Sequence, residues 1–169
     1  MTSLYNFVEI YARALETADH LIGKGVAFTS EKGISEQEML GWRLVDDMNP
    51  LSFQLAVIIN FSNGWVARAA GVAVPESIEG TAMDISGFKA AIADSRAFLG
   101  SITPDQINDR DEALITFKIG DIMEPNLPAG QWLTGFATTN IHFHVSMAYA
   151  ILRMKGVPLG KIDLFPGGL

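Results

Sequence analysis

The 169-residue chain contains no cysteine. This absence excludes disulfides, zinc fingers, thiol nucleophiles and iron–sulfur clusters. Charge is also sparse, because charged residues make up only 18% of the sequence, and Lys+Arg 12 against Asp+Glu 19 leaves a formal net charge of -7. A protein that grips a phosphate backbone needs a surface rich in lysine and arginine, so the acidic balance argues against a nucleic-acid partner.

Long hydrophobic runs are missing as well. The most apolar stretch, Leu51 to Phe61, is interrupted by three polar residues, whereas a bilayer span needs about 20 apolar residues. We therefore expect a core segment there and no membrane association. Residues 1–6 carry neither a basic stretch nor an apolar run, which argues against a secretory signal and makes the cytoplasm the expected compartment.

The standard catalytic motifs are absent too. The sequence has no glycine-rich phosphate loop, no H-E-x-x-H zinc motif and no G-x-S-x-G nucleophile elbow. The acidic group between Asp105 and Glu112 lacks the glycine and the spacing of a calcium loop, so we interpret it as a solvated loop.

What the sequence does contain is a helical pattern. Four segments repeat apolar residues at steps of three and four, which is the spacing of one helix face. These segments are residues 3–28, 49–70, 84–102 and 129–155. Ser35 and Glu38 match a capping box, which predicts a short extra helix to about Trp42. Residues 114–127 alternate and then turn, which predicts a small β-hairpin before the last helix.

The second long helix has no polar face over two turns, because Phe53, residues 55–59 and Phe61 are all apolar. A helix of this kind must be covered on every side. Four helices in one bundle leave part of each helix uncovered, so a second surface is needed. We expect a symmetric partner chain to supply it; loops of the same chain are the alternative.

Three histidines are the remaining candidates for chemistry. His20 falls on the polar face of the first helix and is expected to face solvent. His142 and His144 are separated by about 200° on a helix, so they cannot share one ion from one turn. His144 borders the inward stripe, four residues after Asn140. Either it is a core histidine held by Asn140 or a backbone carbonyl, or it orients a small ligand in a bundle pocket.

Several stretches resemble a bacterial domain-of-unknown-function family within the DinB-like superfamily of four-helix bundles. The stretches are Asn49–Leu51, Arg68–Val72, His144–Val145, Ala148–Arg153 and Gly156–Lys161. The resemblance runs from Leu4 to about Leu164 and is most specific after His142. It implies a single all-α domain over residues 1–169 with up-down-down-up topology, and a homodimer.

Metal-binding members of that superfamily typically take one histidine from the second long helix and two, spaced i and i+4, from the last. Here the second helix has no histidine, and the positions four residues either side of His144 hold Asn140 and Ala148. Neutral amides are poor substitutes for transition-metal ligands. We therefore expect no metal and no cofactor.

Three functions remain open on the sequence alone. The first is a homo-oligomeric, metal-free bundle that binds a small molecule near His144. Its candidate pocket residues are His144, Asn140, Asn60, Asn63 and Trp65. The second is a metal-dependent DinB-like enzyme of the thiol transferase or hydrolase type. The third is a protein-interaction module that uses the hairpin and the region of Trp132 as its contact surface.

Overall fold

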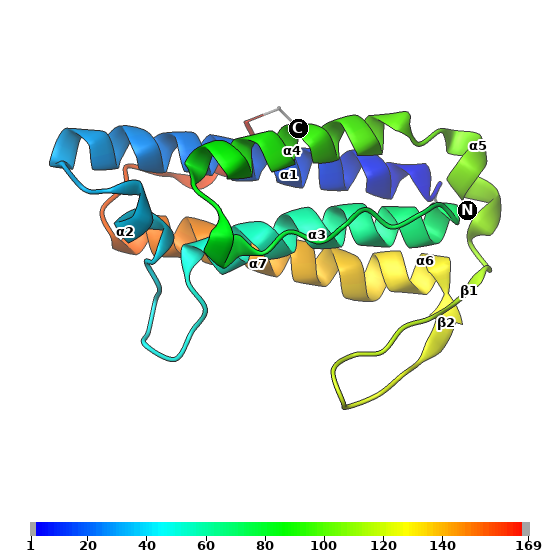
Figure 1. Ribbon diagram of the computed structural model, residues 1–169. Coiled ribbons are helices and arrows are strands. Elements are labelled where there is room, and N and C mark those ends of the chain that lie inside the picture. Colours follow the sequence, from blue (N-terminus) through cyan, green and yellow to red (C-terminus); the bar gives the residue numbers. More distant parts are fainter. Residues whose placement is uncertain (1–2, 167–169) are drawn as a thin grey trace.

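The computed structural model describes residues 3–166 and shows four long helices (Figure 1). They are α1 (Tyr5–Lys32), α3 (Leu51–Ala70), α4 (Ile85–Ser101) and α7 (Thr138–Met154). Each coincides with a segment that the apolar spacing predicts. The shorter helical elements are α2 (Glu36–Leu40), α5 (Pro104–Ile107), α6 (Ala129–Gln131) and 3₁₀ turns at Gly80–Ala82, Asn108–Arg110 and Lys161–Leu164.

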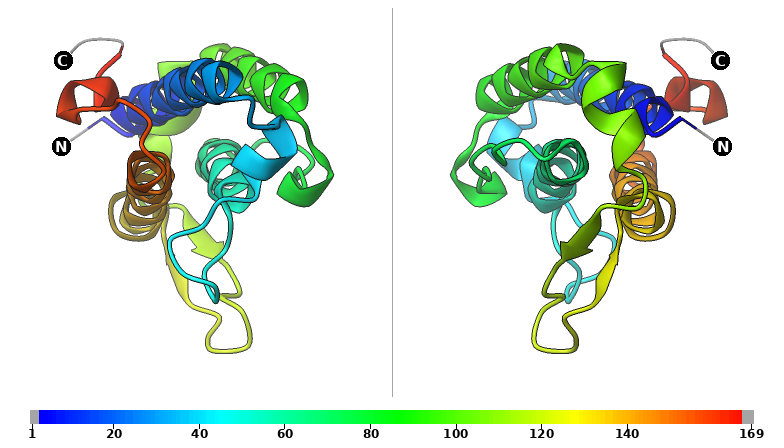
Figure 2. Two further views of the ribbon diagram at one scale, coloured as in Figure 1. Left: turned by 90° about the vertical axis from the view of Figure 1, so that its left-hand side faces the viewer. Right: turned by 90° about the vertical axis from the view of Figure 1, so that its right-hand side faces the viewer.

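The topology is up-down-down-up, as the family resemblance implies. Figure 1 shows α1 and α7 running in one direction and α3 and α4 in the other. Because α3 and α4 are parallel, the connection between them, residues 71–84, travels back along the bundle. Figure 2 shows two layers, with α1 and α4 forming one and α3 and α7 the other. The four-helix bundle with an extra short helix and a hairpin is confirmed.

Helix ends follow the local sequence. Ser35 accepts a hydrogen bond from the backbone N–H of Glu38, and Asp84 accepts one from Gly87, so each caps the helix that follows. Gly71 has φ 70° and ends α3 in the left-handed conformation that favours glycine. The first helix extends to Lys32, four residues beyond the expected end, because Gly25 does not break it. Gly25 instead allows close contact: a Cβ there would lie 2.9 Å from Sδ of Met39.

The last helix runs through Asn140 without a break. The chain stays helical through residues 129–154, and Trp132–Ala137 form a π-helical segment. In a π-helix each backbone N–H bonds to the carbonyl five residues before it, as the N–H of Thr138 does to Leu133. The carbonyl of Leu133 accepts hydrogen bonds from the hydroxyls of Thr138, at 2.7 Å, and Tyr11, at 3.0 Å. The wider turn is thus stabilised by side chains of α7 and α1.

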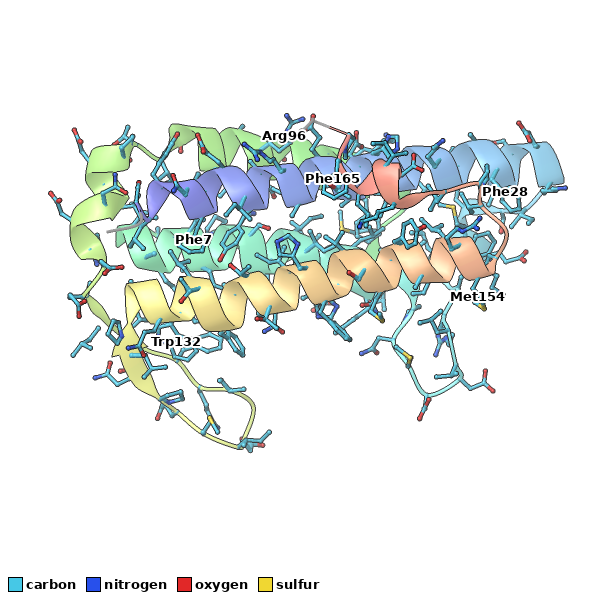
Figure 3. All side chains as sticks on the ribbon, turned by 180° about the vertical axis from the view of Figure 1, so that it is seen from behind. Phe7, Phe28, Arg96, Trp132, Met154 and Phe165 are labelled. Carbon is cyan, nitrogen blue, oxygen red and sulfur yellow. The ribbon has the colours of Figure 1, made fainter. Side chains whose placement is uncertain are left out.

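The predicted hairpin consists of β1 (Leu114–Thr116) and β2 (Asn126–Pro128), paired antiparallel with Leu114 opposite Pro128. It is attached to the bundle by aromatic rings. Trp65 stacks on Trp132 at 4.8 Å between centroids, and Phe117 and Phe136 meet both indoles edge-on. Trp132, at the base of the hairpin in Figure 3, also donates its Nε1–H to the carbonyl of Ile115.

Loops of the same chain cover much of α3. The side chain of Asn60 donates to the carbonyl of Ile78 and accepts from its N–H, which fixes the 71–84 connection against the helix. Gly80 lies so close to the carbonyl of Ser52 that a Cβ would have no room. Phe53, with 38% of its surface exposed, is the large apolar side chain of α3 that stays open. This coverage favours loops of the same chain, rather than a partner chain, as the explanation for the apolar surface of α3. It also reduces the area of α3 that a partner chain could cover.

Among residues 3–166, no helix combines the length and the apolarity that a bilayer crossing requires.

Candidate functional site

His144 lies at the seam between α3 and α7, and its partner is Gln54. The Nδ1 atom of His144 is 2.7 Å from Oε1 of Gln54, and the Nε2 of that amide donates to the carbonyl of Asn49 at 3.0 Å. Gln54 is 3% exposed, so its amide is fixed inside the protein. The imidazole is therefore held by α3, across the helix interface, and its first expected anchor, Asn140, does not hold it.

These contacts determine the protonation of the ring. A backbone carbonyl can only accept, so the amide nitrogen of Gln54 must face Asn49 and the amide oxygen must face His144. An amide oxygen also only accepts, so Nδ1 of His144 carries the hydrogen. The lone pair of Nε2 is then available. Within residues 3–166 no group donates to Nε2, and the atom is not fully buried.

Burial lowers the pKa of His144 below its usual value, because the half-buried ring loses water around its charged form. Two phenylalanines provide much of that environment. Phe53 lies 5.9 Å and Phe143 5.1 Å from the imidazole, measured between ring centroids. His144 is thus a neutral hydrogen-bond acceptor with aromatic neighbours.

The other candidate pocket residues do not converge on His144 through their hydrogen bonds. Asn140 donates to the carbonyl of Phe136 on its own helix. Asn60 fixes the 71–84 connection, and Asn63 donates to the hydroxyl of Ser95 on α4. Trp65 belongs to the aromatic group under the hairpin. His144 does not line any of four cavities found among residues 3–166.

The donor set around His144 does not fit a metal ion. Its hydrogen-bond partner is the neutral amide of Gln54, and the positions four residues either side of it on α7 hold the neutral amide of Asn140 and Ala148, which supplies no donor. Among residues 3–166, no three histidine, aspartate or glutamate side chains come together in a way that could hold an ion. A catalytic zinc site needs three protein ligands, and the side chains around His144 supply one.

His20 is not the freely solvated residue that its position suggests. Its Nε2 lies 2.8 Å from a carboxylate oxygen of Asp163, which follows the last long helix. His142 is exposed on the opposite side of α7 from the Gln54 contact and lines a cavity between α1 and α7.

Sequence reasoning missed Gln54, Phe53 and Phe143. Gln54 was detectable as one of three polar residues in the apolar run from Leu51 to Phe61. The pairing with His144 joins residues 90 positions apart, and no sequence pattern indicated it.

Comparison with protein families finds that the family described as "Domain of unknown function (DUF1993)" matches residues 4–165. Among solved structures, the fold is similar to the crystal structure of a DinB family member protein from Shewanella denitrificans. The TM-score is 0.85 at 24% identity, covering 95% of this chain and 90% of that one. A comparison with curated proteins finds no match. The structural likeness supports the fold and carries no reaction with it.

Proposed function

We propose a function for this chain, which belongs to the DUF1993 family within the DinB-like superfamily. The chain associates with itself, and the outer face formed by α3 and α7 binds a second copy. The observation that carries the proposal is the exposed aromatic pair around His144. Phe53 is 38% and Phe143 is 51% exposed, on adjacent helices, and both contact the imidazole. Exposed aromatic side chains around a polar atom without a partner are typical of binding surfaces.

A second apolar stripe on α7 supports the proposal. The core stripe of this helix includes Ile141, Val145, Ala148 and Leu152. A separate set recurs at steps of four, three and four, which places it along one other side of the helix. This set is Phe143, Met147, Ala150 and Met154, none of which is fully buried. The core of the chain does not cover this stripe.

The face lacks charge, which suits a second copy of the same surface. We define the α3–α7 face as the second stripe of α7 together with Phe53, Val57, Asn140 and His144. None of these residues has a permanently charged side chain. Around a two-fold axis each residue meets the same surface again, so a charge near the axis would repel its own copy. A face without charges avoids this cost.

Two projections border the same face. Figures 1 and 2 show the loop between α2 and α3 and the hairpin extending from this side of the bundle, near its opposite ends. Both carry exposed apolar side chains. They are Val45 in the loop and Leu114, Ile122 and Met123 in the hairpin segment. A second copy seated on the face would lie between the projections and cover part of each.

Self-association also bears on ligand binding near His144. The four cavities noted above among residues 3–166 do not reach the imidazole, but its Nε2 keeps an available lone pair. A second copy would enclose that atom. Binding of a small molecule with an N–H or O–H donor at His144 is therefore the second candidate function, and it depends on the dimer.

The test is the mass in solution, measured by size-exclusion chromatography with light scattering at micromolar concentration. The wild type is expected to be a dimer. Phe143→Glu is expected to weaken association by at least about a hundredfold, because it buries two carboxylates near the axis. The matched control is Ile162→Glu, which adds the same charge at a side chain that is 77% exposed and lies off the face. A monomeric wild type, or equal effects of the two variants, would contradict the proposal.

A further inference from the structure

A cavity of about 470 Å³ opens between α1 and α7, on a side of α7 that the α3–α7 face does not include. Its walls come from three segments. They are Ile10, Arg13, Ala14 and Thr17 of α1, His142, Val145 and Ser146 of α7, and Leu164, Phe165 and Pro166 after the last 3₁₀ turn. Most of the lining is apolar, and this size is within the usual range for small-molecule sites.

Small side chains create the hollow. Ala14 and Thr17 of α1 face Val145 and Ser146 of α7, so the two helices leave unfilled space between them. The returning chain closes one side. Figure 3 shows the segment with Phe165 running from the end of α7 over α1.

Specific contacts hold the returning chain, which forms the outer wall of the cavity, against α1. Asp163, whose side chain is 12% exposed, accepts hydrogen bonds from His20 at 2.8 Å and from the backbone N–H of Gly160 at 2.7 Å. Lys24 lies 3.6 Å from the same carboxylate. One residue further on, the carbonyl of Leu164 accepts a hydrogen bond from the Thr17 hydroxyl. The wall is therefore part of the folded structure.

The rim carries positive charge and no acid. Arg13 lines the cavity and forms no ion pair with any residue from 3 to 166, and the His142 imidazole lies across from it on α7. No lining residue is acidic, and α7 contains no aspartate or glutamate. In a chain with a net charge of -7, this is a local exception. A guanidinium can bind a carboxylate through two parallel hydrogen bonds.

We propose that this cavity binds an apolar molecule that carries one carboxylate, with the hydrocarbon between α1 and α7 and the carboxylate at Arg13. At about 30 Å³ per group the size of a water molecule, the volume admits on the order of fifteen such groups. One guanidinium balances one negative charge. A phosphate monoester, with a charge of about −1.5 to −2 at neutral pH, would exceed what the rim offers.

The test uses octanoate, with octan-1-ol and octylammonium as probes of nearly the same size and different charge. Calorimetric titration of the full chain is expected to show saturable octanoate binding that is at least about tenfold tighter than binding of octanol, and still weaker binding of octylammonium. Methyl NMR signals locate the site, and those of Ile10, Val145 and Leu164 are expected to shift.

Three variants separate the charge from the cavity. Arg13→Gln is expected to weaken octanoate about tenfold and leave octanol unchanged. Ser146→Trp places a large side chain at an exposed rim position, so folding is retained, and is expected to weaken both probes. Arg43→Gln removes the same charge from an exposed loop residue and is expected to change neither.

Two results would overturn the proposal. One is an octanoate affinity that equals that of octylammonium or does not respond to Arg13→Gln. The other is a set of shifted signals at Val57 and Met147, which would place binding on the α3–α7 face. The oligomeric state does not enter either measurement, so this inference and the proposed self-association can fail separately.

Discussion

The imidazole of His144 on α7 is oriented by the amide of Gln54 on α3, 2.7 Å away, and the backbone carbonyl of Asn49 orients that amide in turn. A chain of two hydrogen bonds thus runs from the start of α3 to the outer face of the bundle. It fixes which nitrogen of the ring is available to a partner.

Substitutions of Gln54 test this relationship. Gln54→Leu removes the acceptor for Nδ1–H, and we expect a loss of about 1–3 kcal/mol in the free energy of unfolding, the usual cost of a partly buried polar group without a partner. Nitrogen NMR of the ring should show the Nδ1–H tautomer in the wild type and a tautomer mixture in the variant. Gln54→Glu is the matched control, because a carboxylate at that place should raise the pKa of His144. An unchanged tautomer in Gln54→Leu would contradict the assignment.

The lowered pKa of His144 predicts a pH dependence of stability. The unfolded chain takes up a proton near the usual pKa of 6.5, whereas the folded chain takes it up at lower pH. Between those two pKa values the unfolded state binds more protons than the folded state, so the free energy of unfolding rises with pH. The contribution of His144 reaches its full value above about pH 6.5. Urea unfolding from pH 5 to 8 should show a slope of up to about 1.4 kcal/mol per pH unit from this residue. In His144→Gln this contribution should be missing, and identical slopes in the two proteins would refute it.

The lowered pKa of Asp163 predicts a second pH dependence of stability, at a more acidic pH than that of His144. Hydrogen bonds from the Gly160 N–H and His20, with the charge of Lys24, lower the pKa of this carboxyl below its usual 3.8. The stabilisation is present above that value and is lost as the pH falls through the lowered pKa. Asp163→Asn should cost about 1.5–3 kcal/mol at neutral pH, the range for hydrogen bonds to a charged group. The difference from the wild type should shrink below pH 3.8, and a constant difference would argue against it.

Trp132 links the hairpin to the bundle through both its ring and its N–H. Trp132→Phe keeps the aromatic contact with Trp65 and loses the hydrogen bond to Ile115, so we expect a cost of about 1–3 kcal/mol. Trp132→Ala removes both and should cost about 3–5 kcal/mol. Thermal unfolding followed by circular dichroism measures both. If both variants lost equal stability, the ring packing would contribute nothing measurable.

The fold was predictable because its signals are local. Steps of three and four between apolar residues predicted the four long helices, and Ser35 with Glu38 predicted the start of the short helix α2. The up-down-down-up order came from the family resemblance, since periodicity does not specify direction. The π-helical segment was not predictable, because its stabilisation depends on Tyr11, which reaches it from another helix.

The candidate site was predictable only in part. His144 stood out because it borders the apolar stripe through Asn140, Phe143 and Met147, which was expected to face the core. That expectation was wrong, because Phe143 is exposed and the buried residues of α7 are Ile141, Val145, Ala148, Ile151 and Leu152. Asn60, Asn63 and Trp65 all lie in the second half of α3. Asn60 and Asn63 are three residues apart and share one side of that helix, whereas Trp65 points away from them. Their hydrogen bonds and ring contacts go to the 71–84 connection, to α4 and to the hairpin. Pairing across helices depends on packing, which helix spacing alone does not determine.

The parallel arrangement of α3 and α4 has a consequence for engineering. Because of this arrangement, the 71–84 connection has to run along the length of the bundle on its outside. The side chain of Asn60 holds that connection in place through two hydrogen bonds to the backbone of Ile78. Exposed positions between the end of α3 and this attachment, such as Ala73 and Val74, tolerate a break better than any helix does. A chain with new termini opened there should still assemble its helices, which makes this stretch the natural place to graft a reporter domain.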